Sequence, residues 1–266
     1  MNKNPRILIS NDDGIDAPGL DQLRDIAAQL SDDVWVVAPK NNQSGVGHCL
    51  TLGTELQYTK KSERVFALNG TPADCVIIAC TDLLKDKQPD IVLAGVNHGQ
   101  NLGDIINCSG TLAAAREGAL QGALGIALSQ GIDYENQADV FWHTTNGFAL
   151  EVLQKLIEQA GSAETRNPDI YYNINFPICD MSEVSGIEFV PHQRFFRSAF
   201  RHYPSRNDGK FFVSIPKTPT PMQHGHDFHV LHQDNAISIT PLSLRQSDLE
   251  EIERLRGRIS LDNRSD

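Results

Sequence analysis

The chain has 266 residues, a formal net charge of -11 at pH 7 and a sequence pI near 5.2. A strongly acidic protein repels polyanions at long range, which excludes a general nucleic-acid binder and leaves small ligands and local basic patches possible. The five cysteines show no C-x-x-C pair and no apolar run is long enough to span a bilayer, so we expect reduced thiols and a soluble cytoplasmic protein without a membrane partner.

Strand and helix patterns alternate through the first half of the chain, which predicts βαβ units and an α/β fold. In chain order we expect strand 6–10, helix 18–30, strand 33–38, hairpin-like strands 49–58 and 64–68, helix 72–84, strand 90–95, helix 110–121, strand 124–129, helix 138–160 and strand 169–176. The long helix has apolar residues at helical spacing and should cover one face of the sheet. We expect the sheet to end near residue 176.

From Pro177 onward the chain has seven prolines and short apolar runs, which predict an extension of the fold and not an independent domain. Its expected elements are strands 186–190, 210–215 and 236–240 and a final helix 247–258 with Ser247 as N-cap. Within it, residues 193–203 interleave arginines with aromatic residues. We interpret this segment as an interface between subunits, with a grip on a base, a polyphosphate or RNA as the alternative.

The first predicted strand runs directly into two adjacent carboxylates, Asp12 and Asp13. Open α/β sheets bind ligands at the carboxyl ends of their strands, so we expect this pair at the rim of the sheet. Neighbouring carboxylates repel each other in a low dielectric, and a divalent cation is the commonest way to keep both ionised. The end of this strand therefore predicts a metal site.

Two further loops that follow predicted strands carry oxygen ligands for a cation. Residues 41–48 include Ser44, and residues 95–104 include Asn97 and Asn101. Hydroxyl and amide oxygens ligate hard cations, while amide NH₂ groups donate to phosphate oxygens. We expect these loops to converge with the acidic pair on one rim of the sheet.

A fourth loop, with Ser109, Gly110 and Thr111, precedes an alanine-rich helix. The free N–H groups in the first turn of such a helix are available to an anion. A simple N-cap would explain one of these residues, but it would not explain the glycine between the other two.

Spacing argues against three familiar alternatives. The chain lacks the G-x-G-x-x-G of dinucleotide folds after its first strand, and it lacks a P-loop. Phosphatases that form an aspartyl-phosphate place two acids one residue apart, whereas Asp12 and Asp13 are contiguous. Water activated by a metal is therefore the favoured nucleophile. The general acid stays open among Asp104, His98 and His226.

Several motifs occur in a fixed order over nearly the whole chain. They are NDDGIDAPGL at 11–20, VVAPKNNQSGVG at 36–47, LNGTPADCV at 68–76, GVNHGQNLGD at 95–104, CSGTLAAAREG at 108–118 and SITPL at 238–242. Together these motifs resemble the SurE family of survival-protein nucleotidases. The chain departs from the family pattern at Cys108, Leu112 and Ile105, which bears on substrate preference and rate.

The resemblance implies one SurE-like domain over residues 1–266. Residues 1–176 would form a Rossmann-like, three-layer catalytic core with a mostly parallel sheet. Residues 177–266 would form an extension with a β-hairpin and a helix, which completes the sheet and mediates homodimers or homotetramers.

The resemblance also implies an activity and the residues that support it. A divalent metal, Mg²⁺ or Mn²⁺, would be held by Asp12, Asp13, Ser44 and Asn97. The expected reaction is hydrolysis of nucleoside 5′- and 3′-monophosphates, with short polyphosphate as a further substrate and no stable nucleic-acid partner. We expect Asp12, Asp13 and Asp104 to act in catalysis, and the phosphoryl oxygens to be held by Asn101, Ser109, Gly110 and Thr111. A non-catalytic sensor of nucleotide or metal is the alternative.

Overall fold

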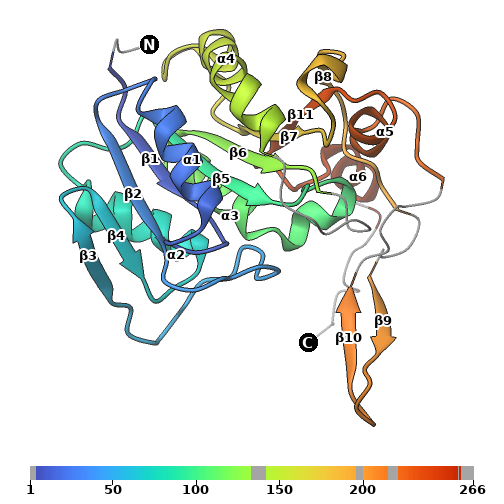
Figure 1. The fold of residues 1–266 in the computed structure, drawn as a ribbon, viewed down its shortest axis with the longest axis horizontal. Coiled ribbons are helices and arrows are strands. Elements are labelled where there is room, and N and C mark those ends of the chain that lie inside the picture. Colours follow the sequence, from blue (N-terminus) through green and yellow to red (C-terminus); the bar gives the residue numbers. More distant parts are fainter. Residues whose placement is uncertain (1–3, 133–141, 196–199, 215–220, 257, 259–266) are drawn as a thin grey trace, which may run out of the picture.

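The computed structural model describes residues 4–132, 142–195, 200–214, 221–256 and 258. Its centre is a nine-stranded sheet, and a separate two-stranded hairpin projects from the body (Figure 1). In spatial order the strands of the sheet are β3 (Tyr58–Ser62), β4 (Val65–Leu68), β2 (Val34–Pro39), β1 (Ile7–Ser10), β5 (Ile91–His98), β6 (Leu124–Gln130), β7 (Ile170–Phe176), β11 (Ile237–Ser243) and β8 (Ile187–Phe189). From β4 to β7 all neighbours are parallel, whereas β3 and β11 join antiparallel.

Helices cover both faces of this sheet. On one face lie α1 (Pro18–Ala27) and α4 (His143–Ala160), and on the other lie α2 (Pro72–Ile78), its π-helical continuation Ala79–Leu83, and α3 (Gly110–Leu120). Strand β1 shows why both faces need cover: Ile7 and Ile9 join the first core and Leu8 joins the second, all fully buried. The predicted three-layer α/β fold is therefore confirmed. Residues 138–141 of the predicted long helix lie outside the described residues.

The expectation that the sheet ends near residue 176 is wrong. Strand β11 pairs antiparallel with β7, and β8 pairs with β11, so the extension adds two strands. The pairing with β11 covers the edge that β7 would otherwise expose, and the apolar side chains Ile237 and Ile239 of β11 join the core cluster that also contains α4.

No helix in the described part of the chain has both the length and the apolar character that crossing a bilayer requires.

Two elements of the extension were not predicted, namely α5 (Asp227–His232) and β9 (Arg201–Pro204). Strand β9 pairs with β10 (Phe211–Ser214) to form the projecting hairpin, and residues 196–199 and 215 lie outside the described residues. The final helix, α6 (Leu249–Leu255), is shorter than expected, and its N-cap is Asp248 and not Ser247. The Asp248 side chain accepts a hydrogen bond from the Glu251 N–H.

The predicted strand over 49–58 is also wrong, because β3 begins only at Tyr58. The preceding segment is held by the N-terminus of α2. The carboxylate of Asp74 accepts bonds from the Thr51 N–H at 3.0 Å and the Thr51 hydroxyl at 2.7 Å, and the Thr71 hydroxyl donates to the Cys49 carbonyl. These bonds satisfy polar groups that a strand would otherwise pair. Short 3₁₀ turns at Gly103–Cys108 and Met181–Glu183 complete the described elements.

A partly buried carboxylate at the start of β2 makes the stability depend on pH. Asp33 accepts bonds from Arg6 at 2.9 Å, Lys87 at 3.1 Å and the Trp35 indole at 2.9 Å. Burial opposes ionisation, but these donors prevail and lower the pKa of Asp33 to about 2. A lowered pKa stabilises the fold above about pH 4, and the contribution is lost as the pH falls towards 2. We expect Asp33→Asn to lower the free energy of unfolding by about 2 kcal/mol at pH 7.

Urea unfolding of the wild type and of Asp33→Asn at pH 7, 5 and 3 measures this effect. The difference between them should shrink between pH 5 and pH 3, because the Asp33 carboxyl of the unfolded chain then binds a proton while that of the folded protein stays mostly ionised. Asp25→Asn is the matched control, because Asp25 is exposed on α1. A loss of equal size at all three pH values would contradict the role assigned to the charge of Asp33.

Candidate functional site

The acidic pair lies on a tight turn at the carboxyl end of β1. The side chain of Asn11 closes this turn, since its amide donates to the Gly14 carbonyl at 2.8 Å and its oxygen accepts the Gly14 N–H at 3.2 Å. Gly14 has a φ of 108°, a left-handed conformation that favours glycine. The turn leaves Asp12 buried, at 4% exposure, and Asp13 partly exposed.

Asp12 connects three segments that are distant in the sequence. Its Oδ1 accepts a hydrogen bond from the Thr111 hydroxyl at 2.6 Å, and its carbonyl accepts the Gln43 N–H at 2.6 Å. Burial raises the pKa of Asp12 to about 6, Thr111 opposes the rise and the charge of Asp13 adds to it. Burial also raises the pKa of Asp13, although the His98 N–H, which donates to this carboxylate at 3.1 Å, partly lowers it. Both carboxyl groups therefore favour a proton or a cation over a bare charge.

The first turn of α3 lies directly against Asp12. A Cβ atom at Gly110 would come within 2.7 Å of the Asp12 Cβ, so only glycine permits this approach. Ser109 is the N-cap, and its hydroxyl accepts the Leu112 N–H at 3.1 Å. The predicted Ser109, Gly110 and Thr111 turn and the acidic pair therefore meet, as the sequence led us to expect.

The other expected cation ligands lie at the carboxyl ends of the two strands that flank β1: Ser44 is on the loop after β2, whereas Asn97, expected on a loop, is one of the last residues of β5. Asn97 donates its amide to the Gly99 carbonyl at 2.6 Å, which leaves its Oδ1 as the atom able to bind a cation. Ser44 is exposed and directly follows Gln43, whose N–H is bonded to Asp12. Among the described residues no three His, Cys, Asp or Glu side chains gather as a metal site, so a cation here would need these mixed oxygen ligands.

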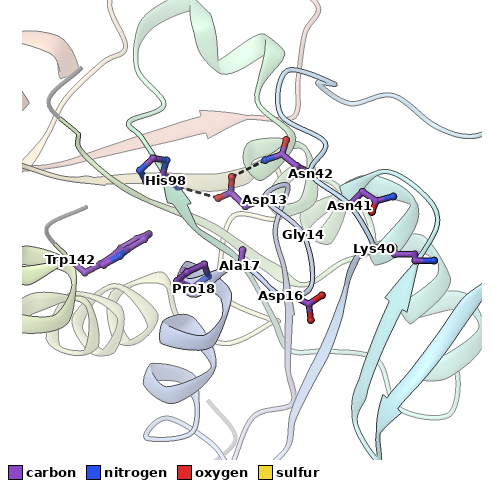
Figure 2. A pocket seen from close by; sticks show the side chains of 11 residues that line it. Asp13, Gly14, Asp16, Ala17, Pro18, Lys40, Asn41, Asn42, His98 and Trp142 are labelled. Atoms are coloured by element: carbon purple, nitrogen blue, oxygen red, sulfur yellow. Dashed lines mark hydrogen bonds between the residues drawn. The ribbon is translucent and has the colours of Figure 1, made fainter. Parts of the chain in front are cut away.

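A pocket of about 500 Å³ opens beside Asp13 (Figure 2). The Asn42 side chain points toward Asp13, His98 lies beside Asp13 and contacts it through its backbone N–H, and Trp142 lies across the pocket from Lys40. The rings of His98 and Trp142 have centroids 6.4 Å apart. Trp142 and Lys40 were not singled out from the sequence, because a tryptophan within a predicted scaffold helix and a lysine after a strand carry no specific signal.

Asn101 is fixed in a buried polar cluster of β6 and β7. Its amide donates to the Ser129 hydroxyl at 2.9 Å, its N–H donates to Asn175 Oδ1 at 2.8 Å, and its carbonyl accepts bonds from the amides of Asn173 and Asn175. The predicted phosphate ligand therefore has part of its amide already engaged. The predicted strand residues Asn173 and Asn175 position this loop, a role that their alternation with apolar residues did not reveal.

The same loop is held from the extension by Asp227, whose side chain is fully buried. Its carboxylate accepts three backbone N–H groups, from Gly103 at 2.6 Å, Gln193 at 2.9 Å and Phe228 at 2.8 Å. A carboxylate that accepts several backbone bonds is well satisfied in the interior. Asp227 thereby links α5 to the loop that carries Asn101.

The three candidates for the general acid are placed differently. His98 lines the pocket beside Asp13. Asp104 instead pairs with Arg194 at 2.7 Å and accepts the Phe195 N–H at 2.9 Å, and it lines a second cleft along α3. His226 is the N-cap residue of α5. Of the three, His98 alone lines the same pocket as Asp13 in the described structure.

Comparison with known proteins gives consistent matches. A family model described as "Survival protein SurE" matches residues 7–198. A protein of Methylorubrum populi named "5'-nucleotidase SurE" is 41% identical over 94% of this chain and 97% of its own length. A protein of the same name from Methylobacterium nodulans is 42% identical over 91% of this chain and 95% of its own length. The crystal structure of the SurE protein from Aquifex aeolicus superposes with a TM-score of 0.78 at 29% identity, covering 95% of this chain and all of that one.

Proposed function

The chain belongs to the SurE family, and on this premise we propose that it is a nucleotidase that hydrolyses nucleoside monophosphates to nucleoside and phosphate. The hydrogen bond of 2.6 Å between Thr111 and buried Asp12 carries the proposal. It brings a cation-seeking carboxylate against the first turn of a helix, where a phosphoryl group finds free N–H donors. We further propose 3′-monophosphates and short polyphosphate as substrates, because the same turn would serve any terminal phosphoryl group.

The side chains present fit a hard divalent cation, Mg²⁺ or Mn²⁺. Asp12, Asp13, Ser44 and Asn97 would hold it through oxygen atoms, the ligands that such cations prefer. The raised pKa of Asp12 and the free Oδ1 of Asn97 support this choice. When bound, the cation polarises the phosphoryl group and lowers the pKa of water.

The residues of the chain would then bind the substrate and move protons. Gly110 and Thr111, at the start of α3, hold the phosphoryl oxygens through backbone N–H groups. Ser109 contributes its hydroxyl, because its N–H is bonded to the Ile106 carbonyl, and Asn101 lies on the neighbouring loop. If only one carboxylate of the acidic pair holds the cation directly, the other accepts the proton of the attacking water. His98, beside Asp13, is our choice to protonate the leaving oxygen, with Asp104 as the second candidate.

We also propose that the 266 residues form one domain and that its extension makes a homodimer or homotetramer. The projecting hairpin supports this, because Phe211, Phe212 and Val213 are each 64% exposed. Adjacent exposed apolar side chains of this kind mark an interaction surface.

Phosphate release from purified protein tests the proposed function. We expect release from nucleoside 5′-monophosphates with Mn²⁺ or Mg²⁺, loss of release on addition of EDTA, and recovery when the metal is restored. Parallel assays with 3′-monophosphates and inorganic triphosphate test the wider substrate range. Nucleotide binding without phosphate release would instead favour the sensor alternative.

A further inference from the structure

A second cleft, of about 560 Å³, runs along α3 on the face of the sheet opposite α1 and α4. Three arginines and two histidines line it against a single carboxylate, that of Asp104. The arginines come from three separate segments: Arg116 from α3, Arg194 from the extension, and Arg245 from the residues after β11. His48 is paired with Glu117 at 2.9 Å, so the three guanidinium groups are the donors that favour an anion here, in a chain with a net charge of -11.

The donors in this cleft are incompletely paired. Arg194 contacts Asp104 at 2.7 Å and Arg245 contacts Asp169 at 2.6 Å, but both arginines are mostly exposed, and exposed pairs of this kind are weak. Arg116 is half-buried and has no hydrogen bond or ion pair to another described residue. Tyr171, which is 8% exposed, likewise has a hydroxyl without a hydrogen bond in the described structure.

The cleft begins at the phosphate turn but extends beyond it. Ser109 lines its near end, and this residue immediately precedes the turn that lies against Asp12. Arg116 follows seven residues later along the helix, a rise of about 10 Å. The Arg116 backbone therefore lies beyond the turn at which Gly110 and Thr111 would hold the phosphoryl group.

We propose that this cleft is a second oxyanion site, which binds a phosphoryl group other than the one that is hydrolysed. Arg116 and Tyr171 are its central donors, with Arg194 and Arg245 at its rim. The ligand is either the distal phosphoryl group of a substrate that carries two or more, or a separate phosphate ion. A role for the distal phosphoryl group of a substrate rests on the proposed nucleotidase function, whereas binding of a phosphoryl group in this cleft does not.

Binding in EDTA tests the site without turnover. Calorimetric titration with inorganic triphosphate and with inorganic phosphate should show binding of at least one probe by the wild type. We expect Arg116→Gln to weaken that binding about tenfold, the value of one charge-assisted hydrogen bond, and Tyr171→Phe to weaken it less. Arg24→Gln on α1 is the matched control, since Arg24 lies on the opposite face of the sheet. Absence of binding by the wild type, or equal binding by Arg116→Gln, would overturn the proposal.

Kinetics then distinguish the two ligand sources. If the site holds a distal phosphoryl group, Arg116→Gln should raise KM about tenfold for a nucleoside 3′,5′-bisphosphate at unchanged kcat, and leave KM for a monophosphate unchanged. If it holds a separate ion, added phosphate should alter monophosphate kinetics in the wild type beyond competitive product inhibition, and only the product inhibition should remain in Arg116→Gln. An equal rise in KM for monophosphate and bisphosphate would overturn the assignment, because the cleft would then belong to the primary phosphate site.

Discussion

Replacing Asp12 by asparagine is expected to lower metal-dependent phosphate release by about a thousandfold or more. A metal contributes several kcal/mol of transition-state stabilisation, and each 1.36 kcal/mol corresponds to a tenfold rate change. The amide introduced by Asp12→Asn would keep the shape and still accept the Thr111 hydroxyl, but it would lack the charge that attracts the cation. The loss should therefore appear in kcat/KM with Mn²⁺ as cofactor, measured by phosphate release.

The same variant should not be less stable than the wild type without metal. Burial raises the pKa of Asp12 to about 6, so at pH 7 the folded protein holds a charge that its surroundings disfavour. Asparagine removes that cost, and we expect an equal or higher melting temperature in EDTA. Asp25→Asn, on the exposed side of α1, should retain full activity and stability. If Asp12→Asn retained most of the activity, the acidic pair would not be the metal site.

Replacing Asp227 by alanine is expected to destabilise the fold by about 3 kcal/mol, because three buried N–H groups would lose a charged acceptor at once. These groups belong to Gly103, Gln193 and Phe228. An unsatisfied buried donor costs about 1–3 kcal/mol, and bonds to charged groups lie at the upper end. Urea unfolding followed by far-ultraviolet circular dichroism measures the loss.

The substitution Asp227→Asn gives a sharper test of the geometry. The new amide oxygen can accept the N–H groups of Gln193 and Phe228, which share Oδ1 in the wild type. The new NH₂ group, however, would replace the acceptor of the Gly103 N–H, so two donors would face each other. We expect a stability between those of the wild type and Asp227→Ala, with reduced turnover because the Asn101 loop shifts. Asp208→Asn, exposed in the hairpin, is the control. If Asp227→Ala had the stability and the turnover of the wild type, the carboxylate of Asp227 would not be what holds this loop.

The sequence predicted the central part of the fold because local patterns determine it. Buried parallel strands such as Ile7–Ser10 read as continuous apolar runs, and the alanine-rich stretch at 110–121 could only be a helix. The proximity of Asp12 and Thr111 was expected because the loops that follow parallel strands lie at one rim of such a sheet.

What the sequence did not predict depends on long-range contacts. The strand at 236–240 was predicted, but not its antiparallel pairing with β7, and α5 has only six residues, too few for a helical pattern to be recognised. Asn101 was expected to face a phosphate, yet Ser129, Asn173 and Asn175 determine where its amide lies. Asp104 ends beside Arg194, a partner ninety residues further along the chain.

The attachment of the Asn101 loop to Asp227 has a consequence for protein synthesis. The bond from Gly103 to Asp227 spans 124 residues, so a nascent chain carries the loop long before its anchor exists. At 5–20 residues per second, this interval is about 6–25 s. During translation the acidic pair and the helix turn can already be formed, while the loop that carries Asn101 has its bonds to β6 and β7 but still lacks its bond to Asp227. We therefore expect ribosome-bound chains that stop before residue 227 to bind divalent cations without releasing phosphate, and the activity to appear only as α5 docks.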